Sequence, residues 1–347
     1  MLPEGWKTLS GDTGDDLVVA MDFEAAGRAE ACFADLVPLL DPARQVWIAT
    51  QPDAGAGAAD RLRYWSDGLR ASGRKVRAVL GFCAGGLYAA ALAETVAQWQ
   101  DALPDVVVFD PEPPTPDTLV KQFDNTVRSL ASVLSETELE EVREAVRRVA
   151  AEHADPAELN SLGDALAAVY RECSGPALEK IGLRADFRED LAATFESLMG
   201  YLAAAADVPL SDGWASVTAI VSATPIWEPA GVLRAIRTDV AHADLLRSPE
   251  IARIVSDELQ EDRHRPLPRG SMTSLNQLVA TVLELPLHDI DDKVGPATHE
   301  SWTSLRHFQL VISVEENYGI TLGKAEIRSV RSVGDLRRLI TEKGGTP

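Results

Sequence analysis

A cysteine flanked by glycines is the residue of this sequence best placed to act as a nucleophile. Cys83 lies in the motif G-F-C-A-G-G at 81–86, after a β-like run at 75–80 and before an alanine-rich helical run at 87–96. Glycines lack Cβ atoms and let a strand and a helix cross closely, so residue 83 can occupy a strained, exposed turn. A thiol at a helix N-terminus faces the positive end of the helix dipole, which lowers its pKa. We therefore predict that Cys83 is a reactive nucleophile with a lowered pKa.

Two further polar residues follow predicted strands. Asp110 ends the continuous apolar run at 106–109, which is typical of a strand buried on both faces. An acid at the carboxyl end of such a strand occupies the edge where open α/β sheets keep their chemistry. His242 directly follows a short run at 238–241, which we also predict to be a strand.

The elements around these residues predict an α/β fold. Alternating strands and helices predict a parallel sheet, and the residues between its strands at 112–212 are predicted to form successive helices. Ser135-Glu136-Thr137-Glu138 has the Ser-x-x-Glu spacing of a capping box. We interpret 112–212 as an inserted helical lid, since a separate helical domain would interrupt an unfinished sheet. The predicted strands are 17–21, 46–50, 75–80, 106–109, 217–223 and 238–241, and the predicted helices beside them are 29–40, 62–71 and one ending near 259.

Composition excludes several classes of function. A length of 347 residues is enough for two or three folding units, and the 46% hydrophobic fraction supports an ordinary globular core. A net charge of −21 argues against a nucleic-acid partner, because phosphates would be repelled. No apolar run is long enough to predict a membrane span, and the N-terminus carries no basic-then-apolar signal, so we expect a cytoplasmic protein. The three scattered cysteines argue against a disulfide framework, and we find no metal-binding or nucleotide-binding motif.

The C-terminal residues have an organisation of their own. We predict a first domain at 1–261, a linker at 262–271 and a small helical bundle at 272–347. The residues Arg269-Gly270-Ser271-Met272 are typical of a cloning scar before a start methionine, which gives the hypothesis that the linker is an engineered join. The predicted helices of the bundle are 275–285, 304–318 and 332–341.

The first part, about Leu17 to Leu259, resembles the thioesterase family of polyketide and nonribosomal peptide assembly lines, which are α/β-hydrolases. The resemblance depends on G-F-C-A-G-G, on V-V-V-F-D and on H-A-D-L-L-R-S-P-E, and the first of these is similar to the nucleophile elbow of that fold. It implies a triad in which Cys83 is the nucleophile, His242 the base and Asp110 the orienting acid. In many other α/β-hydrolases the acid follows the next strand, and there Glu228 is the alternative to Asp110.

The same resemblance implies an oxyanion hole. Its two donors would be the backbone N–H of Ala84 and one from the loop after the first predicted strand, at Phe23 or Glu24. That loop has less glycine than the family usually has.

The second part, nearly all of Met272 to Ile340, resembles acyl carrier proteins, which form four-helix bundles. The resemblance depends on W-T-S-L at 302–305 and V-E-E-N-Y-G-I at 314–320. It implies that Ser304 carries 4′-phosphopantetheine, although Thr303 stands where the family has aspartate. A serine that only caps a helix is the alternative. Arg306 lies at the start of the helix by which carriers commonly dock, where we expect it to face an acidic enzyme. Arg306→Glu is predicted to weaken that encounter without changing carrier folding.

Together the two resemblances imply an acyltransferase that acts on a carrier-bound acyl thioester in natural-product biosynthesis. An acyl-cysteine is itself a thioester, so exchange with the thiol of an acyl or peptidyl carrier protein is reversible and loses little free energy. The Cys variant is similar to acyl or aminoacyl shuttles and to Dieckmann cyclases that release tetramic acids. The cyclase, a type II editing thioesterase and a non-catalytic protein that docks a carrier are therefore the alternatives.

Overall fold

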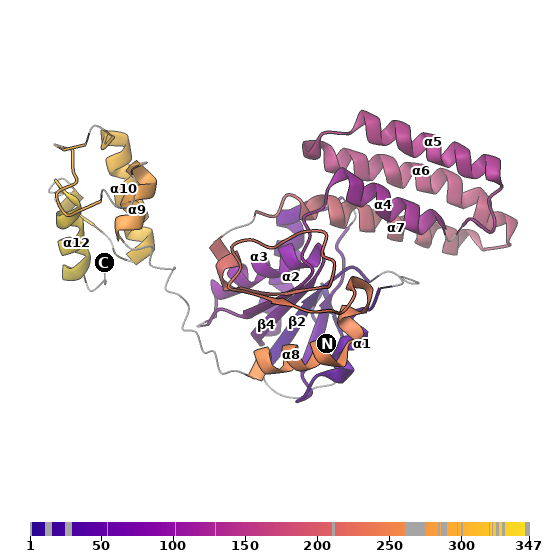
Figure 1. The fold of residues 1–347 in the computed structure, drawn as a ribbon, viewed down its shortest axis with the longest axis horizontal. Helices are drawn as coiled ribbons and strands as arrows, with labels where there is room; N and C mark the ends of the chain where they lie inside the picture. The colour runs from indigo at the N-terminus through magenta and orange to yellow at the C-terminus, as the bar shows by residue number, and fades with distance from the viewer. Residues whose placement is uncertain are drawn as a thin grey trace. The chain divides into compact units, whose positions relative to one another are not determined.

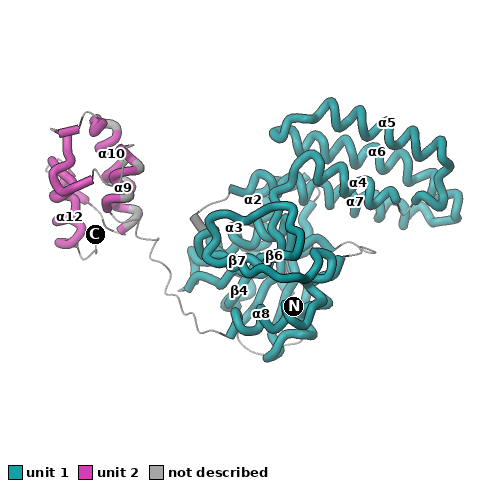
Figure 2. The backbone as a smooth tube through the Cα atoms, viewed as in Figure 1, with its two compact units in different colours: residues 1–263 teal, residues 264–347 magenta. Residues whose placement is uncertain are grey.

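The computed structural model divides the 347-residue chain into two compact units, Met1–Arg263 and His264–Pro347 (Figure 2). In unit 1 it describes residues 2–10, 16–24, 30–53, 55–100, 102–128, 130–209 and 212–260. In unit 2 it describes residues 275–283, 285, 290–296, 298–299, 301–318, 320, 322–323, 326–327 and 330–343. The predicted linker at 262–271 lies outside the described residues.

Unit 1 is built on a seven-stranded sheet of α/β-hydrolase-like architecture, with helices on both faces. The sheet is parallel except at one edge, where β1 pairs antiparallel with β3, so the prediction of an all-parallel sheet is wrong at that strand. The order in space is β1-β3-β2-β4-β5-β6-β7. The strands are β1 (Trp6–Thr8), β2 (Asp16–Met21), β3 (Gln45–Ala49), β4 (Lys75–Phe82), β5 (Asp105–Phe109), β6 (Val217–Val221) and β7 (Arg234–Arg237).

Both faces of the sheet are covered by helices (Figure 1). On one face lie α2 (Ala58–Ser72) and α3 (Gly85–Ala97), and on the other lie α1 (Phe33–Leu36) and α8 (Pro249–Gln260). The sheet separates two hydrophobic cores, one on each face. Of two neighbouring residues of β4, Val79 is buried in one core and Leu80 in the other. Apolar residues at successive positions of a strand are expected where both of its faces are buried.

Two predicted elements differ from the structure. The helix predicted at 29–40 is the short α1 followed by a 3-10 turn at Val37–Leu39, because Pro38 cannot donate the backbone bond that a continuing α-helix needs. The strand predicted at 238–241 is instead β7, at Arg234–Arg237. β7 is a mostly exposed edge strand, so it carries no apolar run that could have marked it.

Four α-helices lie between β5 and β6 among the described residues, in the range that was interpreted as a lid, and we call them the lid helices. They lie one above another at one end of unit 1 (Figure 1). Their aromatic side chains pack together, with ring centroids of Tyr170 and Phe195 4.4 Å apart and those of Phe123 and Phe195 5.8 Å apart. Ser135 and Glu138 form the predicted capping box at the start of α5. The helices are α4 (Pro116–Arg128), α5 (Glu136–Glu152), α6 (Leu159–Lys180) and α7 (Ala185–Ala205).

The last turns of α7 belong to the body of the unit rather than to the lid alone. Tyr201 is 2% exposed, its ring centroid lies 5.0 Å from that of Tyr88 on α3, and the Tyr88 hydroxyl donates to the Tyr201 carbonyl at 3.0 Å. The run at 203–205 is buried alanine, which lets the helix approach closely. α7 therefore places lid residues directly beside the helix that follows Cys83.

The described residues of unit 2 form helices joined by turns and loops. Its helices are α9 (Leu275–Leu283), α10 (Ser304–Tyr318) and α12 (Val333–Glu342), and their apolar residues form one core cluster. The described residues therefore contain three helices of the expected bundle. Over the described parts of both units, no helix has the length and apolar character that crossing a membrane requires.

Candidate active site

Cys83 occupies a strained turn between β4 and α3. Its φ is +51°, a left-handed conformation that is uncommon for a residue with a side chain. The flanking glycines are required by space: a Cβ at Gly85 would lie 2.0 Å from the Met21 carbonyl oxygen, and one at Gly81 would lie 2.6 Å from the Gly85 oxygen. The Cys83 N–H donates to the Phe109 carbonyl on β5 at 2.9 Å.

Asp110 occupies the equivalent position after β5. Its φ is +39°, and its N–H donates to the Ile220 carbonyl on β6 at 2.9 Å. The buried carboxylate lies 2.7 Å from His242 Nδ1 through Oδ2 and accepts the Ser222 N–H at 2.7 Å through Oδ1. Burial by itself would raise the pKa of Asp110, but these hydrogen bonds outweigh it and leave the pKa below its usual value. Asp110 is therefore ionised and holds the imidazole.

His242 begins the 3-10 helix His242–Arg247. Its ring lies against Phe82, with centroids 5.0 Å apart, and the side chain is one-third exposed. His242 and Cys83 both line a cavity of about 130 Å³. The structure thus brings together the predicted nucleophile and base, with the predicted acid behind the base. The remaining lining residues are Asp22, Phe23, Glu30, Phe82, Ala84, Gln122, Leu198, Tyr201 and Leu202.

The two predicted oxyanion donors, Ala84 and Phe23, line the same cavity. The backbone of Ala84 makes a hydrogen bond that favours the Cys83 thiolate, so this N–H lies beside the reacting sulfur. The Phe23 N–H instead donates to Asp22 Oδ1 at 2.8 Å. In this structure the Phe23 N–H, which was predicted to donate to an oxyanion, therefore donates to the buried carboxylate of Asp22.

The expected lowering of the Cys83 pKa is wrong. Burial raises the pKa of the thiol to about 12, and the carboxylate of Glu112 adds to the increase, as do those of Asp22 and Asp110. A thiolate in this cavity loses hydration and faces like charges, and these effects exceed the favourable end of the helix dipole and the Ala84 hydrogen bond. The resting group is the neutral thiol.

Glu228, the alternative acid, is paired with another residue and does not line the cavity. It is exposed and forms a two-point ion pair with Arg237 on β7, with its nearer distance 2.6 Å. That pairing lowers the pKa of Glu228. Among the described residues, the carboxylate that contacts His242 Nδ1 is that of Asp110.

Among the cavity residues that were not predicted from the sequence are Asp22 and Tyr201. Asp22 directly follows β2, so its place after a strand end was a usable signal. Tyr201 lies in the lid and no motif marks it. In the described part of the chain no group of three or more His, Cys, Asp or Glu side chains could hold a metal ion.

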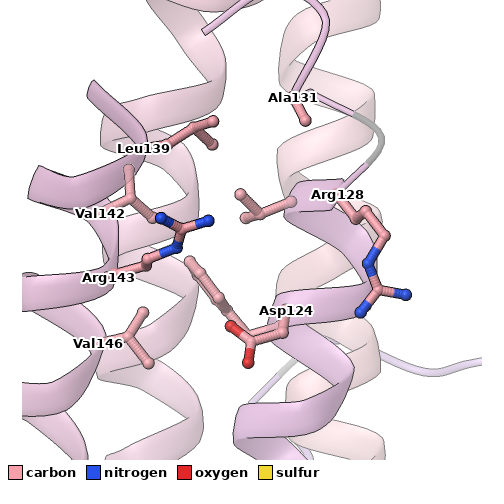
Figure 3. A pocket seen from close by; sticks show the side chains of 9 residues that line it. Asp124, Arg128, Ala131, Leu139, Val142, Arg143 and Val146 are labelled. Atoms are coloured by element: carbon pink, nitrogen blue, oxygen red, sulfur yellow. The ribbon is translucent and has the colours of Figure 1, made fainter. Parts of the chain in front are cut away.

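A larger cavity, of about 320 Å³, lies within the lid between α4 and α5 and contains none of the predicted site residues (Figure 3). Its walls are mostly apolar, formed by residues such as Phe123, Val142 and Val146. Arg143 points from α5 into the gap, and Asp124 approaches it from α4 (Figure 3). The cavity separates lid helices and is not part of the Cys83 site.

In unit 2, Ser304 is the first residue of α10. Thr303 precedes it and accepts the Arg306 N–H at 3.3 Å, so the residue that replaces the family's aspartate caps the helix. The Arg306 guanidinium donates to the Leu283 carbonyl at the end of α9 at 3.0 Å. Arg306 therefore joins two helices of the bundle, and whether its substitution leaves carrier folding unchanged stays a prediction.

Comparisons with known proteins relate the chain to two groups. No family model matches the chain. A 71-residue segment, 20% of the chain, is 31% identical to "Polyketide-8 synthase acyl carrier protein 2" of Streptomyces avermitilis and covers 82% of that protein.

Solved structures similar to the chain include two thioesterase domains. The Vlm2 thioesterase domain bound with a dodecadepsipeptide has a TM-score of 0.41 and 19% identity, with 76% of this chain and 99% of that chain covered. The NocB thioesterase domain from the nocardicin cluster has a TM-score of 0.42 and 17% identity, with 74% and 98% covered. A haloalkane dehalogenase of Bradyrhizobium elkanii has a TM-score of 0.41 and 14% identity, with 73% and 91% covered. All three TM-scores lie below 0.5, and the fold of unit 1 follows instead from its strand order and its strand–turn–helix geometry.

Proposed function

Because a 71-residue segment of this chain belongs to the acyl carrier protein family, we propose that unit 2 is a carrier and that unit 1 is an acyltransferase serving such carriers. Unit 1 would move an acyl or aminoacyl group to or from a carrier thiol through an acyl-Cys83 thioester, in polyketide or nonribosomal peptide biosynthesis. The observation that carries this proposal is the cavity lined by both Cys83 and His242, whose imidazole is held by Asp110.

The geometry supports a stepwise exchange of thioesters. His242 accepts the Cys83 proton, and the sulfur attacks the carbonyl carbon of a carrier-bound acyl thioester, while the carbonyl electron pair moves to oxygen. The electron pair then returns, the bond between the acyl carbon and the carrier sulfur breaks, and His242 returns the proton to that leaving sulfur. Asp110 stabilises the imidazolium throughout. An acceptor thiol reverses the sequence.

The raised pKa of Cys83 fits this order of events. A neutral thiol needs a base at the moment of attack, so proton transfer to His242 is part of the reaction rather than a resting state. The acyl-enzyme remains a thioester, which an acceptor thiol can take up with little change in free energy.

The start of α10 fits the expected prosthetic group. Ser304 begins a 15-residue helix, and the N-terminus of a helix favours the phosphodiester anion that joins 4′-phosphopantetheine to a carrier. When attached, that group supplies the thiol that bears the acyl chain.

The test uses the full chain with Ser304→Ala, so that unit 2 cannot itself be loaded. Incubation with an acyl group on a separate carrier should add one acyl mass to the intact protein, located on the Cys83 peptide. Cys83→Ala in the same background should abolish the addition, whereas Cys173→Ala, which changes a lid thiol outside the cavity, should not.

The acylated protein is then mixed with a second chain that has Cys83→Ala and an intact, phosphopantetheine-loaded Ser304. Appearance of the acyl group on this acceptor supports transfer. Release of free acid instead would identify an editing thioesterase, and release of a cyclised product would identify a Dieckmann cyclase. No acylation of Cys83 would leave a docking protein and contradict the proposal.

A further inference from the structure

The Tyr201 hydroxyl is a buried polar group beside the turn that holds Cys83. Among the described residues it has no hydrogen-bond partner, although the side chain is only 2% exposed. Buried hydroxyls in folded proteins usually have a partner, so one without any marks a place where a ligand or reacting group can supply it. Tyr201 lines the same cavity as Cys83 and His242.

The position of the hydroxyl is set by the turn that holds the nucleophile. The Tyr201 oxygen lies 3.0 Å from where a Cβ of Gly85 would be, two residues after Cys83. The ring is fixed from two sides, with centroids 5.6 Å from Phe23 and 5.0 Å from Tyr88. A ring held in this way presents its hydroxyl in one place, as a preorganised donor requires.

The second oxyanion donor was predicted at Phe23 or Glu24, and of these two residues only Phe23 lines the cavity. The Phe23 N–H donates to the Asp22 carboxylate at 2.8 Å, whereas Ala84 keeps its backbone donor beside the sulfur. A tetrahedral intermediate formed on Cys83 therefore has one donor from the turn and needs another.

We propose that the Tyr201 hydroxyl is the second oxyanion donor of this site, acting together with the Ala84 N–H. This inference rests on the proposed function. When the Cys83 sulfur bonds to the thioester carbon, the carbonyl electron pair moves to oxygen, and that oxygen accepts hydrogen bonds from Tyr201 and Ala84. When the pair returns and the bond to the leaving thiolate breaks, the Tyr201 proton has stayed on its own oxygen.

The surroundings of Tyr201 keep it protonated, which a donor needs. Burial raises the pKa of Tyr201 well above its usual value, and the neighbouring Tyr88, Asp22 and Cys83 act in the same direction. Arg61 is the opposing charge, and its effect is the smallest of these. Tyr201 is therefore a donor over the whole working pH range and not a general base.

The experiment compares two reactions of the same sulfur in the full chain with Ser304→Ala. Acylation of Cys83 by an acyl N-acetylcysteamine thioester passes through an oxyanion, whereas alkylation by iodoacetamide displaces iodide at a saturated carbon and does not. Loss of one oxyanion donor typically lowers a rate by about 10²–10³-fold. We expect Tyr201→Phe to lower the acylation rate by roughly this factor and to leave the alkylation rate within about twofold.

Tyr170→Phe is the matched control, because Tyr170 is a buried lid tyrosine that does not line the cavity. It should leave both rates unchanged. Equal acylation by Tyr201→Phe and the parent chain would overturn the inference, and so would a parallel loss of acylation and alkylation, which would indicate a structural role. Absence of acylation in the parent chain, with normal alkylation, would instead overturn the proposed function and the inference with it.

Discussion

Cys83 should react slowly with an alkylating reagent at neutral pH, because its thiol is protonated there. The perturbation is pH, and the physical basis is a thiol whose pKa burial raises from 9.0 to about 12. A shift of this size corresponds to roughly 4 kcal/mol against forming the thiolate. Near pH 7 it lowers the thiolate fraction by about 10³-fold relative to an ordinary thiol.

Part of this loss is recovered, because a more basic thiolate is a better nucleophile. With a Brønsted slope of about 0.4–0.5, three pKa units return roughly 20-fold in rate. The net expectation is that Cys83 reacts about 50-fold more slowly than a small model thiol at pH 7. Since the thiolate fraction grows tenfold per pH unit below the pKa, the logarithm of the rate should rise by about one per unit through pH 10.

The assay is the rate of iodoacetamide addition to the Cys83 peptide between pH 6 and 10, measured by mass spectrometry on the full chain beside a model thiol. Glu112→Gln removes the largest charge contribution to the raised pKa and should speed the reaction at each pH. Glu228→Gln, an exposed carboxylate paired with Arg237, is the matched control and should not. A plateau below pH 8 would show a preformed thiolate–imidazolium pair and refute the reasoning.

Three further outcomes can be checked with single variants. Asp110→Asn should lower the acylation rate of Cys83 by several orders of magnitude, as loss of an orienting acid does, whereas Glu228→Gln should lower it less than twofold; the reverse ranking would make Glu228 the acid. Gly85→Ala should abolish soluble folded protein, judged by circular dichroism and gel filtration, because its Cβ would lie 2.0 Å from the Met21 oxygen; a normally folded variant would contradict the stated close approach. Arg306→Ala should destabilise unit 2 by about 1 kcal/mol in urea unfolding, the usual contribution of one hydrogen bond. An unchanged midpoint would show that the hydrogen bond from Arg306 to Leu283 does not stabilise unit 2.

The parts of the fold that the sequence could predict are those with a local physical signature. The β-like run at 75–80 marked β4, and the apolar run at 106–109 marked β5 because both faces of that strand are buried. Glycine spacing marked the turn at Cys83, because the helix crosses the strand so closely there. β7 left no such mark, since an exposed edge strand has no apolar pattern. The helix predicted at 29–40 was longer than α1, because the apolar periodicity continued past Pro38.

The chemistry of the site depended on contacts between distant residues, and there the sequence was less informative. The helix dipole acting on Cys83 was visible from adjacent residues, but the carboxylates of Asp22 and Glu112 that oppose it come from the ends of two other strands. Tyr201 reaches the cavity only because the end of α7 packs against α3. Such proximity is a property of the fold, and no spacing along the chain encodes it.

The backbone bonds at the ends of β4 and β5 have a consequence for how this site can change during evolution. Cys83 donates its N–H to Phe109, and Asp110 donates its N–H to Ile220, so each residue is joined to the next strand through main-chain atoms. Neither bond depends on which side chain the residue carries. Exchange of sulfur for oxygen at residue 83 would therefore leave the spacing of nucleophile and acid intact. On the proposed function, a single exchange of Cys83 for serine would replace the thioester acyl-enzyme by an oxoester without disturbing these main-chain bonds.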